Sequence, residues 1–191
     1  MYGLVNKAIE DLVISSAGKE AWDRIRECAG LQEMEMLDSS HYEDEVTYSL
    51  VQAASEILGQ SAEDILCAFG KHWVTYTDKN GWSNLFGATG EDLVGFLRNL
   101  DDMHARVNSA MPEGCMPEFT VIDKDGAFQL EYRSEREGLA PMVSGILAGL
   151  AEHFEESWTI EHVDHKSRCG IDRFLLTRQD VHAETDLNHA A

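Results

Sequence analysis

Apolar side chains in the first 111 residues recur every three or four positions, which places them on one face of a helix. Gly30 and Gly59 each follow such a stretch, and residues 32–43 are polar and acidic. Ser61 and Asp64 have the spacing of a helix cap at the start of another such stretch. Pro112 ends the last apolar stretch of this region. The pattern predicts helices at about residues 2–16, 22–29, 46–57, 62–75 and 91–111, with chain breaks at Gly81 and 87–90.

After this region the spacing changes to the alternation of β-strands. Residues 117–122 and 128–134 flank an Asp-Lys-Asp-Gly turn and predict a β-hairpin. An apolar helix over 139–154 and two further strands, at about 159–163 and 171–177, follow. This order predicts an α+β fold, with an N-terminal helical lobe and a C-terminal β-β-α-β-β lobe that forms a four-stranded antiparallel sheet.

A chain of 191 residues is long enough for one domain. We expect this domain to cover residues 1–179, with a helical lobe at 1–60 and the remaining helices and the α/β lobe at 61–179. The polar residues 180–191 are expected to form a frayed tail.

Charge and composition exclude several classes of function. The chain carries 15 Lys and Arg against 35 Asp and Glu, a formal net charge of −20. That charge excludes unaided nucleic-acid binding and argues against docking on an anionic membrane, and no apolar run is long enough to span a bilayer. The N-terminal segment carries acids, unlike a signal peptide. The four cysteines form no CxxC pair, so we expect a reducing, cytoplasmic location.

Common catalytic motifs are also missing. The sequence has no phosphate-binding GxxxxGK[ST] loop, no dinucleotide-binding GxGxxG, no HExxH and no GxSxG. Nucleotide-using enzymes and serine hydrolases are therefore disfavoured.

One histidine lies on an apolar stripe. His104 falls on the same helical face as its apolar neighbours, in steps of three and four residues. The stripe comprises Leu93, Leu97, Leu100, His104, Val107 and Met111. A histidine in such a place is either a core residue hydrogen-bonded to a carbonyl group, or a ligand for a metal or a haem iron. On position alone, the core histidine is the commoner case.

A second feature follows the predicted hairpin. Tyr132, Ser134 and Arg136 alternate along the chain, so a continuous strand would point all three to one face. A phenol, a hydroxyl and a guanidinium could together bind a carboxylate or phosphate, with Arg136 donating two parallel hydrogen bonds. The alternative is an ordinary solvent face of a hairpin. Arg133 and Glu135 would point to the opposite face and be solvated.

The two features are more specific in combination than either is alone. A buried histidine, an anion clamp and a helix rich in small residues together indicate a flat, dianionic and largely apolar cofactor. Haem has these properties, because its iron suits the histidine, its propionates suit the clamp and its edges are apolar.

Five segments of the chain resemble the haem nitric oxide/oxygen-binding (H-NOX) family, namely MYGLVNKAIEDLV, DEVTYSLVQAASEILG, AFGKHWVTYT, FLRNLDDMHARV and YRSEREGLAPMV. The family includes stand-alone bacterial sensors and the haem domain of soluble guanylate cyclase. The resemblance spans Met1 to about Thr177, and its most specific parts are the LDxxH stretch around His104 and the YxSxR triplet. It implies haem b held between the two lobes.

The resemblance assigns roles to individual residues. His104 would be the proximal iron ligand, and the YxSxR triplet would bind the propionates through Tyr132, Ser134 and Arg136. Pro117 matches a proline that presses on the haem and distorts it. The wall opposite His104 would draw on Val5, Ile9, Trp73 and Met142, each of which could equally be plain core. Gly70 would be either a hinge near the haem or a site of close helix packing.

A weaker cluster lies near the C-terminus. His162, His165 and Cys169 are close in sequence, and some relatives bind zinc through Cys and His in this lobe. The pattern is incomplete here, so structural zinc is the less favoured interpretation.

The resemblance implies a haem-based sensor that binds nitric oxide, and also carbon monoxide, at ferrous iron. Nitric oxide would break the bond to His104 and relax the haem away from Pro117. The partner would be a separately encoded histidine kinase or cyclic-di-GMP enzyme, and the chain itself would not be an enzyme. Alternatives are an oxygen-binding sensor or carrier, a haem-domain fragment of a guanylate cyclase, and a haem-free interaction domain.

Ligand choice depends on a hydrogen-bond donor. In oxygen-binding relatives a tyrosine on the helix after YxSxR holds the bound oxygen, but Pro141 and Met142 stand there in this chain and neither donates. Trp73 carries an indole N–H, which could instead point at a carbonyl group. We therefore expect no lasting oxygen complex.

Overall fold

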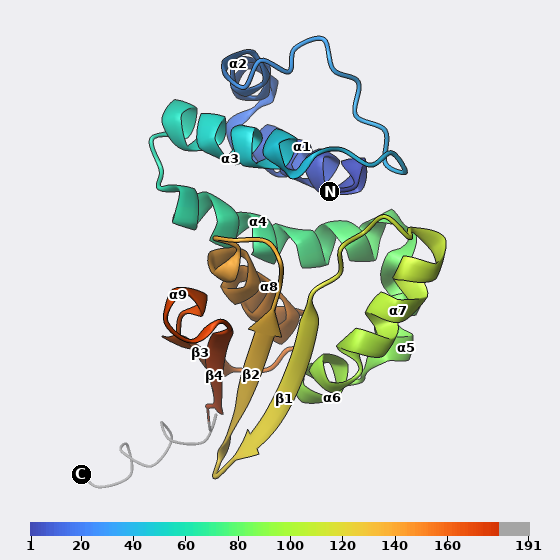
Figure 1. The fold of residues 1–191 in the computed structure, drawn as a ribbon, viewed down its shortest axis with the longest axis vertical. Helices are drawn as coiled ribbons and strands as arrows, with labels where there is room; N and C mark the ends of the chain where they lie inside the picture. Colours follow the sequence, from blue (N-terminus) through green and yellow to red (C-terminus); the bar gives the residue numbers. More distant parts are fainter. Residues whose placement is uncertain (180–191) are drawn as a thin grey trace, which may run out of the picture.

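The computed structural model describes residues 1–179, so the tail expected at 180–191 lies outside the described residues. Helices gather at one end of the molecule, and a sheet with its own helices forms the other end (Figure 1). The α+β class predicted from the sequence is confirmed.

The helical end contains α1 (Gly3–Ala17), α2 (Lys19–Cys28), α3 (Asp44–Leu58) and the start of α4 (Ala62–Thr77). Ser61 caps α4 as its sequence predicts, because its Oγ accepts a hydrogen bond of 3.1 Å from the Asp64 N–H. A buried hydrogen bond of 2.7 Å from the Thr47 hydroxyl to the Asn6 side chain joins α3 to α1.

A kinked segment, η1 (Asp78–Trp82), leads from α4 into α5 (Ser83–Thr89), α6 (Leu93–Arg98) and α7 (Leu100–Ala110). The remaining elements are β1 (Glu118–Lys124), β2 (Ala127–Arg133), α8 (Ala140–His153), β3 (Trp158–Asp164), α9 (Lys166–Cys169) and β4 (Asp172–Arg178). The four strands pair antiparallel in the order β1-β2-β4-β3. The inner residues Leu130, Phe174 and Leu176 lie in one core with Leu147 and Leu150 of α8.

Two stretches differ from the sequence prediction. The helix expected over 91–111 is two helices, because Asn99 leaves the helical conformation and its side-chain amide donates a hydrogen bond of 2.8 Å to the Thr89 carbonyl. The expected break at 87–90 is partly wrong, since Gly87 lies inside α5. Gly81 does interrupt the chain, with a positive φ of 96°.

Helix α4 belongs to both hydrophobic cores. Ile65, Leu66 and Phe69 pack with α1, α2 and α3, whereas Val74 packs with α8 and the sheet. The packing therefore divides within α4 and not at the boundary expected after residue 60. Because one rigid helix enters both cores, each lobe positions the other.

Two glycines allow α4 and α8 to approach very closely. A Cβ added at Gly70 would lie 2.0 Å from the Met142 carbonyl oxygen, and one at Gly145 would lie 2.0 Å from the Cys67 carbonyl oxygen. Close packing thus accounts for Gly70, without the hinge considered for it. The contact also places Trp73, one turn further along α4, near Met142.

Substitution of Gly70 by alanine is expected to destabilise the protein by about 1–3 kcal/mol, because the added methyl group meets backbone that cannot rotate away. Gly87→Ala is the matched control, since Gly87 is also helical but has open space at its Cβ position. That control should be neutral or gain up to about 1 kcal/mol from helix propensity. Urea titration of the two variants measures the difference, and equal effects would contradict the close-packing role.

Candidate functional site

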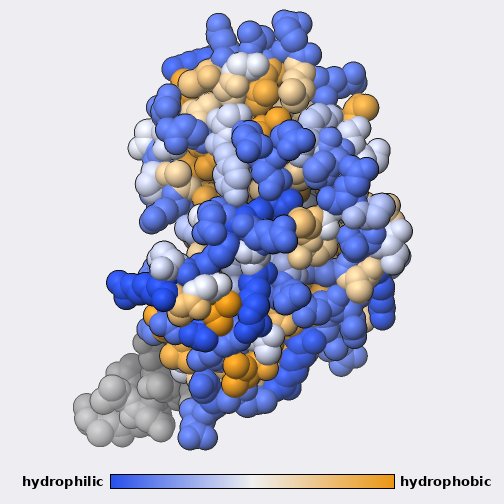
Figure 2. Space-filling model, viewed as in Figure 1, coloured by the Kyte–Doolittle hydropathy of each residue, from blue (hydrophilic) through white to orange (hydrophobic). Residues whose placement is uncertain are grey.

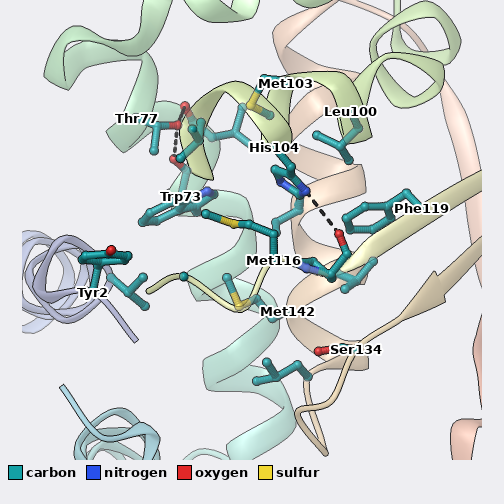
Figure 3. A pocket seen from close by; sticks show the side chains of 18 of the residues that line it. Tyr2, Trp73, Thr77, Leu100, Met103, His104, Met116, Phe119, Ser134 and Met142 are labelled. Atoms are coloured by element: carbon teal, nitrogen blue, oxygen red, sulfur yellow. Dashed lines mark hydrogen bonds between the residues drawn. The ribbon is translucent and has the colours of Figure 1, made fainter. Parts of the chain in front are cut away.

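A cavity of about 270 Å³ lies between α7 with the following loop on one side and α1, α4 and α8 on the other (Figure 3). Its walls are mostly apolar side chains, among them Val5, Trp73, Met103, Val107, Met116, Phe119, Met142 and Val143. The polar groups lie at defined places: His104 projects from α7, and Ser134 and Arg136 lie together beyond the end of β2.

His104 presents one nitrogen to the cavity. Its Nδ1 lies 3.4 Å from the Pro117 carbonyl oxygen, and because a carbonyl only accepts, this contact assigns the ring proton to Nδ1. The Nε2 lone pair is then free. Burial lowers the pKa of His104 below its ordinary value, although the contact with Pro117 and the nearby Asp101 oppose the shift. The imidazole is therefore neutral at pH 7 and available as a metal ligand.

Asp101 and Phe119 hold this histidine in place. The Asp101 carboxylate accepts a hydrogen bond of 2.9 Å from the Phe119 N–H, which fixes α7 against the start of β1. The Phe119 ring packs between His104 and Tyr132, with centroid separations of 5.7 and 5.3 Å. Sequence reasoning assigned no role to Asp101, although it lies three residues before His104 on the same helix.

The YxSxR triplet is arranged differently from the prediction. Strand β2 ends at Arg133, so Tyr132 is on the strand while Ser134 and Arg136 lie in the loop after it. The alternation that was expected to aim all three side chains is therefore wrong beyond Arg133. The loop achieves the same grouping, because the Ser134 hydroxyl accepts a hydrogen bond of 3.1 Å from the Arg136 N–H and all three residues line the cavity.

Arg136 is held by a carboxylate that the sequence did not reveal. Its Nε donates to Asp44 Oδ2 at 2.6 Å, its Nη2 donates to Asp44 Oδ1 at 3.2 Å, and its Nη1 donates to the Cys115 carbonyl at 2.6 Å. The ammonium group of Met1 lies 2.7 Å from the same carboxylate. Two cations therefore surround one anion, so these three groups together carry a net charge of +1.

The pKa of Asp44 agrees with this arrangement. Burial opposes its ionisation, but the hydrogen bonds from Arg136 and from the Met1 ammonium outweigh burial and hold the pKa below its usual value. Asp44 therefore stays ionised at neutral pH. A distance of 92 residues along the chain separates Asp44 from Arg136, and no sequence pattern links them.

The wall opposite His104 contains three of the four side chains named for it. Val5, Trp73 and Met142 line the cavity, as does Pro117 on the side of His104. Ile9 is not part of the lining and is only 1% exposed in the core formed with α2 and α3. Four methionines to which sequence reasoning assigned no role at the site also line the cavity, namely Met1, Met103, Met116 and Met111 of the apolar stripe.

The donor set fits haem. One neutral imidazole nitrogen faces an apolar space, and a positively charged end stands apart from it, which suits a flat apolar group with a central metal and acidic substituents. The residues that would hold this group are His104 for the iron and Tyr132, Ser134 and Arg136 for the carboxylates.

A second group of possible metal ligands lies at β3 and β4. The ligand atoms of His162, His165 and Asp172 lie within 4.8 Å of one another. Cys169, which the zinc hypothesis included, is not part of the group, and its thiol donates instead to the Ile171 carbonyl at 3.2 Å. Asp172 Oδ1 already lies 2.9 Å from His162 Nε2 and also accepts from the Lys166 N–H. Structural zinc at this place stays the less favoured interpretation.

Comparisons with known proteins give consistent results. A family model described as Haem-NO-binding matches residues 2–162. Two relatives from Caenorhabditis elegans are the soluble guanylate cyclase gcy-35, 27% identical over all of this chain, and the soluble guanylate cyclase gcy-34, 30% identical over 80% of it. The chain spans only 28% and 23% of the lengths of these two relatives.

Solved structures show the same fold. An H-NOX protein from S. oneidensis in the Fe(II) ligation state superposes with a TM-score of 0.86 at 21% identity, covering 94% of this chain and 97% of that one. An Fe(II) unliganded H-NOX mutant from K. algicida gives a TM-score of 0.82 at 23% identity, covering 95% and 98%. Over residues 1–179, no helix has the length and apolar character needed to cross a membrane.

Proposed function

The chain belongs to the haem-NO-binding (H-NOX) family, and from that premise we propose that its cavity holds haem b and senses nitric oxide at ferrous iron. The observation that carries this proposal is the free Nε2 of His104, which faces an apolar cavity whose far end is positively charged. When bound, the haem iron supplies the site at which a gas molecule binds.

Each residue has a distinct part in this function. His104 holds the iron from α7, and its Nδ1–H contact with the Pro117 carbonyl orients the ring and increases its strength as a ligand. Tyr132, Ser134 and Arg136 bind the carboxylates. Pro117 lies beside His104 in the wall, where it would press on the face of the bound group.

The signal begins at His104. When bound, the group would supply an iron at which nitric oxide weakens the bond to His104, so that His104 would be freed from the iron and α7 released with it. Pro117 would then be relieved of its contact with the bound group, and the two lobes would rotate relative to each other. This is a two-state change that the gas biases by binding one state better.

The receiver of the signal is a separately encoded protein, either a histidine kinase or a cyclic-di-GMP enzyme. The net charge of −20 and the largely hydrophilic face in Figure 2 suit a basic surface on that partner, since opposite charges speed association. Four exposed cysteines without disulfides favour the reducing cytoplasm.

Two alternatives remain open to test. Oxygen binding is favoured by one observation, the indole of Trp73 in the cavity wall. A haem-domain fragment of a guanylate cyclase is favoured by the short span of this chain within its cyclase relatives.

Absorption spectra of the reduced protein distinguish these functions. With nitric oxide we expect a band typical of iron that has lost its histidine, with carbon monoxide a band of iron that keeps it, and in air no lasting oxygen complex. A stable oxygen spectrum in air would support the oxygen-binding alternative. A purified protein that takes up no haem would contradict both haem functions.

A further inference from the structure

We propose that Lys166 positions the carboxylate-binding loop (residues 134–138). Its ammonium group holds the backbone of Ser134 and Arg136, and so sets where their side chains meet the carboxylates of the bound group. This inference rests on the proposed haem function. Lys166 is not part of the cavity lining, so it is a positioning residue and acts through the loop.

The first observation is that side chains hold this loop in place of backbone pairing. Strand β2 ends at Arg133 and α8 begins at Ala140. Over residues 1–179, no backbone–backbone hydrogen bond outside the helices and strands involves residues 134–138. The polar backbone groups of such a loop need other partners, and these partners decide where the loop lies.

The second observation is that Lys166 is such a partner. Its Nζ donates to the Ser134 carbonyl at 2.6 Å and to the Arg136 carbonyl at 3.3 Å. The same Nζ lies 2.7 Å from the Glu137 carboxylate, but the Glu137 side chain is 78% exposed whereas that of Lys166 is 21% exposed. Because solvent screens the pair with Glu137, the two contacts with carbonyl groups carry most of the effect.

The third observation is that Lys166 is itself fixed. Its backbone N–H donates to Asp172 Oδ1 at 3.0 Å, and the same oxygen lies 2.9 Å from His162 Nε2. The Asp172 side chain is largely buried. The start of α9 is therefore fastened to β4, and the lysine reaches the loop from a rigid part of the sheet lobe.

The helical lobe holds the same loop from its other side. The Tyr48 hydroxyl of α3 donates to the Glu137 carbonyl at 3.1 Å, and Asp44 of the same helix binds the Arg136 guanidinium. The carboxylate-binding loop is thus bound to both lobes, and Lys166 joins it to the sheet lobe.

Loss of the ammonium group would leave two carbonyl groups of the loop without this donor and release the loop from the sheet lobe. Ser134 and Arg136 would keep their side chains but lose their fixed arrangement, and a binding group that is not held in advance binds less tightly. We expect haem to dissociate about three- to tenfold faster, which is less than for loss of Arg136 itself.

Lys166→Met tests this expectation in the haem-loaded protein, because methionine keeps an unbranched apolar stem and removes the donor. Transfer of haem to an acceptor protein should be faster, and the bending frequencies of the haem carboxylates in resonance Raman spectra should shift. Lys166→Arg keeps a charged donor and should restore both values. Arg168→Met is the matched control, since it removes the same charge from an exposed side chain of the same helix and should change neither.

Hydrogen exchange of the amides at residues 134–138 gives a readout that does not depend on haem. In Lys166→Met these amides should exchange faster than in the parent, with and without haem, while the rest of the chain keeps its rates. Unchanged exchange in the loop would overturn the inference. A uniform rise along the whole chain would also overturn it, because that result indicates a general loss of stability.

A measurement on the parent covers the case in which Lys166→Met does not fold. An ammonium group held by two carbonyl groups exchanges its protons slowly, so the ¹⁵N-labelled parent should show an ammonium signal that Lys166→Arg lacks; absence of that signal contradicts the proposed contact. The haem-loaded samples separate the two levels of the proposal. A parent that takes up no haem contradicts the proposed function, whereas carboxylate frequencies that are equal in the parent and Lys166→Met contradict this inference alone.

Discussion

His104→Gly is expected to lose the bond between the protein and the haem iron, with haem dissociating at least about 10- to 100-fold faster than from the parent. Among the side chains that line the cavity over residues 1–179, His104 is the one that offers an unpartnered imidazole nitrogen. Burial keeps this imidazole neutral, so its removal takes away a ligand that is ready at pH 7. The five-coordinate ferrous spectrum should disappear.

Imidazole in the buffer should restore that spectrum, because the space left by the ring admits a free imidazole. His72→Gly is a suitable control, since His72 is also helical but pairs with Asp11 at 2.8 Å outside the cavity lining. Comparison of the two visible spectra, with and without imidazole, makes the measurement. A His104→Gly variant that keeps the parent spectrum in plain buffer would show that another residue holds the iron.

Arg136→Ala is expected to give the second largest effect, a haem dissociation rate about 30-fold faster or more, which corresponds to about 2 kcal/mol for a mostly desolvated charge pair. The Arg136 side chain is only 15% exposed, so solvent screens it weakly. Arg133→Ala is the control, because Arg133 is exposed, pairs with Glu131 and lies outside the cavity lining. Transfer of haem to an excess of an acceptor protein measures both rates.

Asp44→Asn separates direct binding from an indirect structural effect. If Arg136 contacts the carboxylates itself, loss of the competing Asp44 charge leaves haem bound at least as tightly. If Arg136 acts only by joining Asp44 to the loop at Cys115, Asp44→Asn should loosen haem as much as Arg136→Ala does. The second outcome would remove Arg136 from the group of haem-binding residues.

The spacing of apolar residues predicted the helices and strands correctly wherever the local pattern is regular. The spacing of Leu100, His104 and Val107 predicted the helical face that lines the cavity, and alternation predicted the hairpin. No sequence pattern near Asn99 indicates the break in the helix. The Asn99 side chain donates to the Thr89 carbonyl, and this acceptor comes within reach only when α5 packs beside α7. Strand alternation likewise failed after Arg133, where a loop replaces the strand.

The site was predictable residue by residue but not as a network. His104, Trp73 and Met142 were named from the sequence and lie around one cavity. The partner of Arg136 was not named, because Asp44 lies 92 residues away along the chain. In the separate group at β3 and β4, Asp172 lies beside His162 and His165 in the place considered for Cys169. Such pairs depend on how the helical lobe and the sheet meet, which is information that a single sequence holds only implicitly.

The break at Asn99 has a mechanical consequence for α7. Before it, α6 buries Leu93, Phe96 and Leu97, whereas α7 buries only Leu100. The two helices are therefore held differently: α6 is anchored to the core by three buried side chains, whereas α7 is held near its start by Leu100 and by the hydrogen bond from the Phe119 N–H to Asp101. If His104 holds the iron as proposed, a force applied at His104, which lies beyond both contacts, would tilt α7 without lifting α6 from the core.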